Sequence, residues 1–232
     1  MKNRKIGYTY GSVSGRYSFR KEKSIAFEST LERDLIALLE FNDSVIDVIE
    51  QPVTLEYVNQ NGRKTTYTPD FLVYFKTSPA YGMSNHHPRP MLIEVKPHRI
   101  LRKKLAELRP KFKIAMKYAR ENGYIFKIYD ENRIRGQELK NINFISRHKN
   151  LGYDDEEERR IIEHLKAVGH TTVDHLLAHL YVTDEQRGIG LGQTWHLLAN
   201  KKIACDIGMP LGQHTVIWLN VDESYEEGVW NG

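Results

Sequence analysis

The sequence is poor in cysteine and in long apolar segments, and each shortage excludes a class of protein. Its 232 residues contain one cysteine, Cys205, which cannot form an internal disulfide or a cysteine-rich zinc site. No apolar run approaches the roughly 20 residues needed to cross a bilayer, and no apolar signal core follows the basic start MKNRK. We therefore expect no membrane association and a protein that stays inside the cell, in a reducing compartment.

Acidic side chains are scarce in the first part of the chain and abundant in the last. Residues 1–150 carry 28 Lys and Arg against 16 Asp and Glu, whereas residues 151–232 carry 6 against 14. A positive surface suits a polyanion such as DNA, and a negative one repels it. We expect the two parts to be separate domains that meet different partners.

The pattern of residues divides the chain into three regions. Residues 1–25 are rich in Gly, Ser, Tyr and basic side chains without a sustained period, which predicts a mobile basic arm. Residues 26–150 show a helix from Ser29, strands, an Asn-Gly hairpin, a buried strand at 91–96, a basic helix and a last strand. This order predicts an α/β domain with a mixed sheet flanked by helices. Residues 151–232 show three helices and two short strands, the pattern of a winged helix.

One strand that otherwise has a buried composition carries two charges on one side. In MLIEVKP, residues 91–97, Glu94 and Lys96 project the same way because side chains alternate along a strand. Asp70 of TPDFLV lies at the end of a neighbouring predicted strand, so its carboxylate can meet that of Glu94. Two close carboxylates repel each other unless a cation such as Mg²⁺ lies between them. With a lysine to orient or deprotonate water, these are the parts required for phosphodiester hydrolysis.

The same segments resemble a known nuclease family. TPDFLVYF followed by MLIEVKP resembles the PD-(D/E)xK nuclease signature, whose core is a restriction-endonuclease-like mixed sheet. STLERDLIALLEFNDSVIDVIEQPVTLEY, YTPDFLV and IEVKP, in that order, resemble the TnsA endonuclease subunit of heteromeric bacterial transposases across roughly residues 26–130. The resemblance implies a Mg²⁺-dependent DNA endonuclease of the bacterial cytoplasm, with Mn²⁺ as a substitute ion and no small-molecule cofactor. It would cut one strand at each transposon end.

The resemblance also implies a set of site residues. Glu32, Asp70 and Glu94 would bind metal, and Lys96 would lie beside the attacking water. Glu32 also fits a capping box with Ser29, and Glu28, one turn earlier, is its rival as the helix acid. Phosphate contacts are expected from the basic helix, with the candidates Lys103, Lys104, Lys111 and Lys113.

The partner of the acidic second domain follows from its charge. Its third predicted helix, residues 184–200, holds one basic residue, Arg187, so we predict docking to a protein rather than to DNA. The resemblance implies the transposase subunit or its regulatory ATPase. Two other functions stay open: a stand-alone restriction or repair nuclease, and a non-catalytic DNA-binding scaffold with structural ion pairs. Partner-dependent cutting and metal binding that depends on Asp70 would separate the three.

Overall fold

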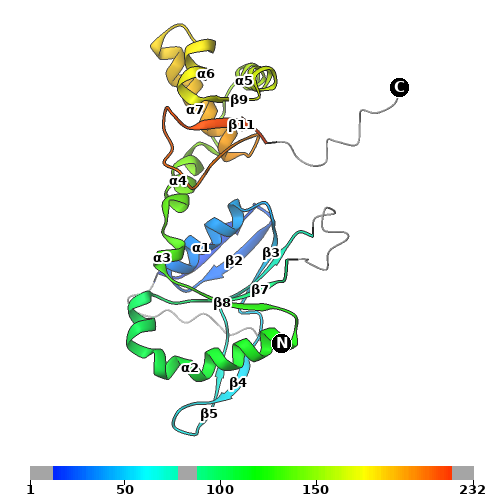
Figure 1. Ribbon diagram of the computed structural model, residues 1–232, viewed down its shortest axis with the longest axis vertical. Helices are drawn as coiled ribbons and strands as arrows, with labels where there is room; N and C mark the ends of the chain where they lie inside the picture. Colours follow the sequence, from blue (N-terminus) through cyan, green and yellow to red (C-terminus); the bar gives the residue numbers. More distant parts are fainter. Residues whose placement is uncertain (1–12, 78–87, 221–232) are drawn as a thin grey trace, which may run out of the picture. The chain divides into compact units, whose positions relative to one another are not determined.

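The computed structural model describes residues 13–77 and 88–220, which belong to two compact units. Unit 1 is the part up to Gly136, and unit 2 begins at Gln137 (Figure 1). Within the described residues, no helix has both the length and the apolar character that crossing a bilayer requires.

The division lies earlier than the change of charge near residue 150 indicates. Helix α4 (Gln137–Ile145) belongs to unit 2. The side-chain amide of Asn141 on this helix donates to the carbonyls of Ile207, at 2.8 Å, and Met209, at 2.6 Å. The charge asymmetry persists at the new boundary, because unit 1 has 25 basic and 15 acidic residues and unit 2 has 9 and 15.

Unit 1 is built on a four-stranded mixed sheet, as predicted. Its order is β3 (Val45–Glu50), β6 (Phe71–Phe75), β7 (Met91–Val95) and β8 (Ile125–Tyr129). The first three strands are antiparallel neighbours, and β8 runs parallel to β7. The parallel pair requires a crossover, which the long helix α2 supplies.

A corner of the chain precedes β6. Strands β4 (Leu55–Val58) and β5 (Lys64–Tyr67) form a separate hairpin around the Asn-Gly turn. The run KTTYTPDFLVYF leaves this hairpin at Pro69, which has no backbone N–H to give to a ladder. Asp70 then joins the sheet at the start of β6, since its N–H donates to the carbonyl of Ile93 at 3.0 Å. The corner thus brings Asp70 to the carboxyl end of β7.

Helices α1 (Thr30–Phe41) and α2 (His98–Glu121) lie on opposite sides of the sheet (Figure 1). Pro110 allows a bend or a restart of the second helix, but the non-helical residue is Lys104, at φ −121° and ψ 19°. Proline removes the donor for the carbonyl four residues earlier. That carbonyl, of Ala106, accepts instead from the side-chain amide of Gln60 in the β4–β5 hairpin.

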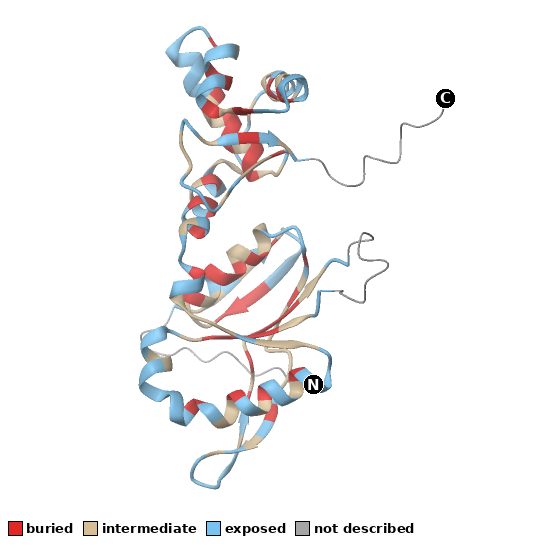
Figure 2. Ribbon diagram, in the orientation of Figure 1, coloured by how far each residue is buried: buried red, intermediate tan, exposed pale blue. Residues whose placement is uncertain are grey.

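The buried face of α2 forms a core with one face of the sheet. Figure 2 shows buried residues recurring along the helix on the side toward the strands. The buried residues of this core come from α2, the β4–β5 hairpin and the sheet: Ala115, Ala119, Leu55, Tyr67, Leu72 and Leu92. Leu92 and Glu94 share a strand face, so Glu94 extends the face that α2 covers.

The predicted basic arm is partly a folded hairpin. Residues 1–12 lie outside the described residues, but β1 (Gly15–Phe19) and β2 (Lys23–Phe27) pair antiparallel. Phe19, Ile25 and Phe27 are buried. Burial of these side chains supplies the free energy that orders a segment with no helical period. The prediction of a mobile arm is therefore wrong for residues 15–25.

Unit 2 contains the three predicted helices, α5 (Asp155–Val168), α6 (Val173–Leu180) and α7 (Asp184–Ala199). Its sheet has the order β10 (Ile203–Cys205), β11 (Val216–Leu219) and β9 (His170–Thr172), with antiparallel neighbours. The winged-helix assignment stays a prediction.

Candidate active site

Glu94 is the buried centre of the candidate site. Its side chain is 2% exposed, and three donors from different elements hold its carboxylate. The hydroxyl of Tyr67 on β5 donates to Oε2 at 2.8 Å. The Nζ atoms of Lys96, after β7, and of Lys111, on α2, lie 3.2 Å and 3.5 Å from Oε1. A buried carboxylate requires such partners, since an isolated one loses its hydration energy.

Asp70 lies directly across from Glu94. The antiparallel register pairs Phe71 with Ile93, so one step further places Asp70 opposite Glu94 on the same sheet face. Its Oδ2 accepts from the N–H of Val95 at 2.6 Å. Burial, followed by the negative charges of Glu94 and Glu32, raises the pKa of Asp70 well above its ordinary value, against the opposing effect of Lys96. The two carboxylates are therefore a repelling pair in a buried setting.

Lys96 is the cation that balances this pair. Burial lowers the pKa of Lys96, but the carboxylates of Glu94, Asp70 and Glu32 outweigh that effect, and the net pKa is raised. Lys96 is consequently charged at neutral pH. A charged ammonium group donates hydrogen bonds and cannot accept a proton.

Glu32 joins the site from the first turn of α1. Ser29 is the N-cap, its Oγ accepts from the N–H of Glu32 at 3.2 Å, and the hydroxyl donates to Oε1 of Glu32 at 2.8 Å. The other oxygen, Oε2, accepts from the N–H of Glu28 at 2.7 Å. Burial is the largest cause of the raised pKa of Glu32; these hydrogen bonds and the positive charge of Lys96 lower it, and the negative charge of Glu28 raises it.

The structure distinguishes Glu32 from its rival. The carboxylate of Glu28 accepts from the side-chain amide of Gln51 at 3.1 Å. Glu32, by contrast, interacts electrostatically with both Asp70 and Lys96. Glu32 therefore lies on the side of the site, and its role as the helix acid stays a prediction.

The residues predicted from the sequence thus come together at one corner of unit 1, although Glu32 and Lys96 are far apart in the chain. Within the described residues, no group of three or more Asp, Glu, His or Cys side chains is arranged to hold a metal ion. Two carboxylates nevertheless suit Mg²⁺, which is commonly bound by one or two carboxylates and several waters. The repulsion between Asp70 and Glu94 is what a divalent cation would relieve. The donor set therefore fits such an ion through these two residues.

The four phosphate candidates on α2 have different positions. Lys111 is 18% exposed, and its Nζ lies 5.1 Å from the centroid of the Tyr67 ring as well as beside Glu94. Lys104 is exposed and forms a surface ion pair with Glu107 at 3.7 Å, and Lys103 is exposed too. Lys113 lies on another face of the helix, in a groove beside β8. Of the four, Lys111 belongs to the site.

Two contacts of Glu94 were not predicted as part of the active site. Lys111 was grouped with the other basic residues, although it lies three residues after buried Leu108 and four before buried Ala115. This spacing places it beside the buried stripe of the helix and is a signal that the sequence carries. Tyr67 has no such signal, because it reaches Glu94 from a hairpin outside the main sheet.

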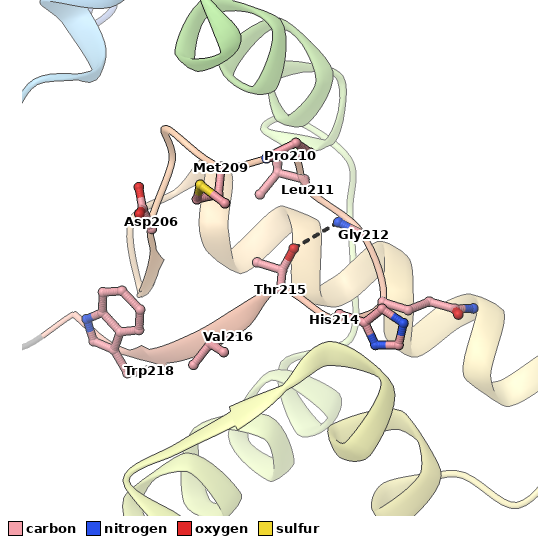
Figure 3. Close-up of a pocket in the computed structure, with 10 residues that line it drawn as sticks. Asp206, Met209, Pro210, Leu211, Gly212, His214, Thr215, Val216 and Trp218 are labelled. Carbon is pink, nitrogen blue, oxygen red and sulfur yellow. Dashed lines mark hydrogen bonds between the residues drawn. The ribbon is translucent and has the colours of Figure 1, made fainter.

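Unit 2 contains a hollow of about 550 Å³ between β11 and the preceding loop (Figure 3). Its lining is mainly apolar and includes Met209, Leu211 and Trp218. The titratable members, Asp206 and His214, lie at opposite ends of the labelled cluster. This hollow therefore lacks the close acid pair that marks the corner in unit 1.

Comparison with known families agrees with the geometry. Residues 42–131 match the TnsA-like endonuclease N-terminal family, and residues 134–207 match the TnsA endonuclease C-terminal family. No curated protein matches the chain. The first match contains Asp70, Glu94 and Lys96, whereas Glu32 precedes it.

These two matches define the class of protein, which is a nuclease, and more closely an endonuclease subunit of a transposase. They follow each other in order and together extend from residue 42 to residue 207. The chain belongs to the TnsA-like endonuclease family, and the resemblance found in its motifs is confirmed.

Proposed function

We propose that the chain is a metal-dependent DNA endonuclease that hydrolyses one phosphodiester, on one strand, at each transposon end. The observation that carries this proposal is the convergence of Glu32, Asp70, Glu94 and Lys96, with mutual electrostatic effects, at the corner beside β7. Sites with several perturbed titratable groups in contact are candidates for catalysis.

Asp70 and Glu94 would hold Mg²⁺, or Mn²⁺ in its place. Such an ion would polarise the scissile phosphate and stabilise the charge on the leaving oxygen. The contacts of Asp70 support this role, since the Val95 N–H fixes one oxygen, Oδ2, at 2.6 Å. Glu32 contributes a third carboxylate, for a second ion or for the attacking water.

Lys96 positions the attacking water. In the metal-free site the charges of Glu94, Asp70 and Glu32 raise its pKa, so the ammonium group is charged and can donate a hydrogen bond to that water. A divalent ion would offset those charges, so removal of a proton from the water by Lys96 stays an alternative. Tyr67 holds Oε2 of Glu94, and Lys111 shares Oε1 with Lys96. Lys111 is close enough to contact a phosphate oxygen once a divalent ion shares the charge of Glu94.

Unit 2 docks to protein, either the transposase subunit or its regulatory ATPase. Arg187, the basic residue of α7, is already engaged, because its guanidinium donates to the carbonyl of Tyr181 at 3.3 Å and lies 3.9 Å from Asp184. Val182 and Ile189, at the start of this helix, are 88% and 55% exposed. Exposed apolar side chains beside an acidic first turn, with Asp184 and Glu185, suit a protein surface better than a phosphate backbone.

The test is nicking of a supercoiled plasmid that carries a transposon end, with Mg²⁺ and with or without the neighbouring transposition proteins. Wild type should nick only with its partners, and Asp70→Asn should bind DNA without nicking it. Asp47→Asn is the matched control, because it removes the same charge from an exposed ion pair with Lys23. Full nicking by Asp70→Asn would refute the assignment of the site.

The same assay separates the alternatives. A stand-alone restriction or repair nuclease would nick the plasmid alone, at sites unrelated to the transposon end. A non-catalytic scaffold would nick under no condition and would bind no metal through Asp70. In that case the role of Glu94 and Lys96 would be a structural ion pair.

A further inference from the structure

A basic groove lies between α2 and the edge strand β8, on a different face of the helix from Lys111. We call it the β8 groove; its volume is about 540 Å³. Four basic residues line it: Arg109 and Lys113 from α2, Lys127 from β8 and Arg133 from α3 (Glu131–Ile134). The side chain of Lys127 projects from the opposite strand face to Phe126 and Ile128.

The charge of the β8 groove is unbalanced. All four cations are exposed, and no acidic residue is part of the lining. Within the part of the chain that the structure describes, none of the four side chains forms an ion pair. Arg133 does contact an aromatic face, with its guanidinium carbon 5.7 Å from the centroid of the Tyr129 ring. The groove therefore presents an anion-binding surface with its donors available.

The floor of the groove is apolar. Phe112 and Phe126 pack with their ring centroids 6.0 Å apart, and Ile128 continues the floor along β8. Met116, on the adjacent turn of α2, is 48% exposed. A groove that needed only phosphate contacts would gain nothing from an exposed methionine. Cations around an apolar floor are the combination found where single strands bind, since sugars and unpaired bases also need apolar contact.

The floor also adjoins the active site. The parallel register pairs Ile128 with Glu94 and Phe126 with Leu92, so these side chains lie on the same face of neighbouring strands. The backbone of Lys96 donates to the carbonyl of Tyr129 at 2.9 Å. The β8 groove is thus one strand away from the carboxylate of Glu94.

We propose that the β8 groove binds unpaired DNA, the few nucleotides next to the cut in the nicked strand. This inference rests on the proposed function and names the surface that holds its substrate. Duplex DNA would use the cations but not the floor. An acidic peptide would satisfy the charge, but adjacency to Glu94 favours a ligand that continues into the site.

The experiment measures binding of the full chain to a short fluorescent single strand and to a duplex, by anisotropy, in EDTA. Arg109→Gln/Lys113→Gln is compared with Lys117→Gln/Arg120→Gln, which removes two charges from α2 outside the groove. The groove variant should bind the single strand about tenfold more weakly, with a salt slope smaller by about 1.4, because each phosphate contact contributes about 0.7. The control variant should keep the wild-type slope.

A second variant tests the apolar floor. Met116→Ser should weaken single-strand binding about threefold or more, leave the salt slope unchanged and leave duplex binding unaffected. Equal effects of the two double variants would overturn the proposal. The proposal would also be overturned if the groove variant lost equal affinity for duplex and single strand while Met116→Ser lost none. A poly-glutamate peptide that displaces the fluorescent single strand as well as a DNA strand of equal charge would overturn it too. Wild type that binds through the groove but never nicks with its partners would count against the proposed function alone.

Discussion

Asp70→Asn should be more stable than wild type without metal. With metal added it should be less stable than wild type, because only wild type gains from metal binding. Asparagine keeps the shape and can still accept from the Val95 N–H, but it removes a buried charge that faces Glu94 and Glu32. The pKa of Asp70 is raised well above its ordinary value, so the charged form is disfavoured in the folded chain. Removing that charge should therefore raise the free energy of unfolding at pH 7, by on the order of 1 kcal/mol.

The pH dependence has a definite sign. A carboxyl group whose pKa is raised in the folded state binds its proton more tightly there than in the unfolded chain, so its contribution to stability is present at low pH. That contribution is lost as the pH rises from the ordinary value of 3.8 through the raised pKa of Asp70. The advantage of Asp70→Asn should accordingly be small near pH 4 and largest at neutral pH.

Thermal unfolding followed by circular dichroism measures both effects. Each kcal/mol should move Tm by about 2–4 °C for a chain of this size. In EDTA at pH 7, Asp70→Asn should melt above wild type. Metal at about 100 times its Kd adds about 2.7 kcal/mol to a chain that binds it, so wild type should gain this and Asp70→Asn should not. Asp47→Asn should differ from wild type by less than about 1 kcal/mol in both conditions. A metal-free Asp70→Asn protein that melts below wild type would refute the reasoning.

Three further substitutions test the surroundings of Glu94. Tyr67→Phe removes the 2.8 Å hydrogen bond to Glu94 and should lower the free energy of unfolding by about 1–3 kcal/mol in urea titrations; an unchanged midpoint would contradict that contact. Lys111→Met removes a cation that competes with Mn²⁺ for Glu94, so it should tighten Mn²⁺ binding severalfold in calorimetry while reducing nicking. Weaker Mn²⁺ binding by this variant would contradict that competition. Glu32→Gln should reduce nicking at least tenfold and Glu28→Gln much less, and the reverse order would make Glu28 the helix acid.

The convergence of the candidate-site residues could be predicted because short-range signals coincide with them. Alternation along β7 places Glu94 and Lys96 on one face, and the break at Pro69 marks the corner where Asp70 enters the sheet. Ser29 was predicted to cap α1, and its hydroxyl does accept from the Glu32 N–H. These features depend on neighbours within a few residues of sequence, which a period or a turn motif can reveal.

Features that depend on distant contacts were missed. The β1–β2 hairpin has no strong turn motif, and it is held by burial of Phe19 and Ile25 rather than by local preference. The start of unit 2 depends on the hydrogen bonds of Asn141 to a loop more than 60 residues later. The non-helical residue of α2 is Lys104, and Gln60, from another element, donates to the carbonyl that Pro110 leaves without a helical donor. A single sequence carries no local record of such pairings.

The most direct test of the central claim is a crystal of the full chain soaked in Mn²⁺ and measured at the manganese absorption edge. An anomalous peak should lie between the carboxylates of Asp70 and Glu94, within coordination distance of both, and be absent from crystals of Asp70→Asn. A peak elsewhere, or a density map in which Lys96 and Lys111 both remain on Oε1 of Glu94 at saturating Mn²⁺, would contradict a metal site at this corner.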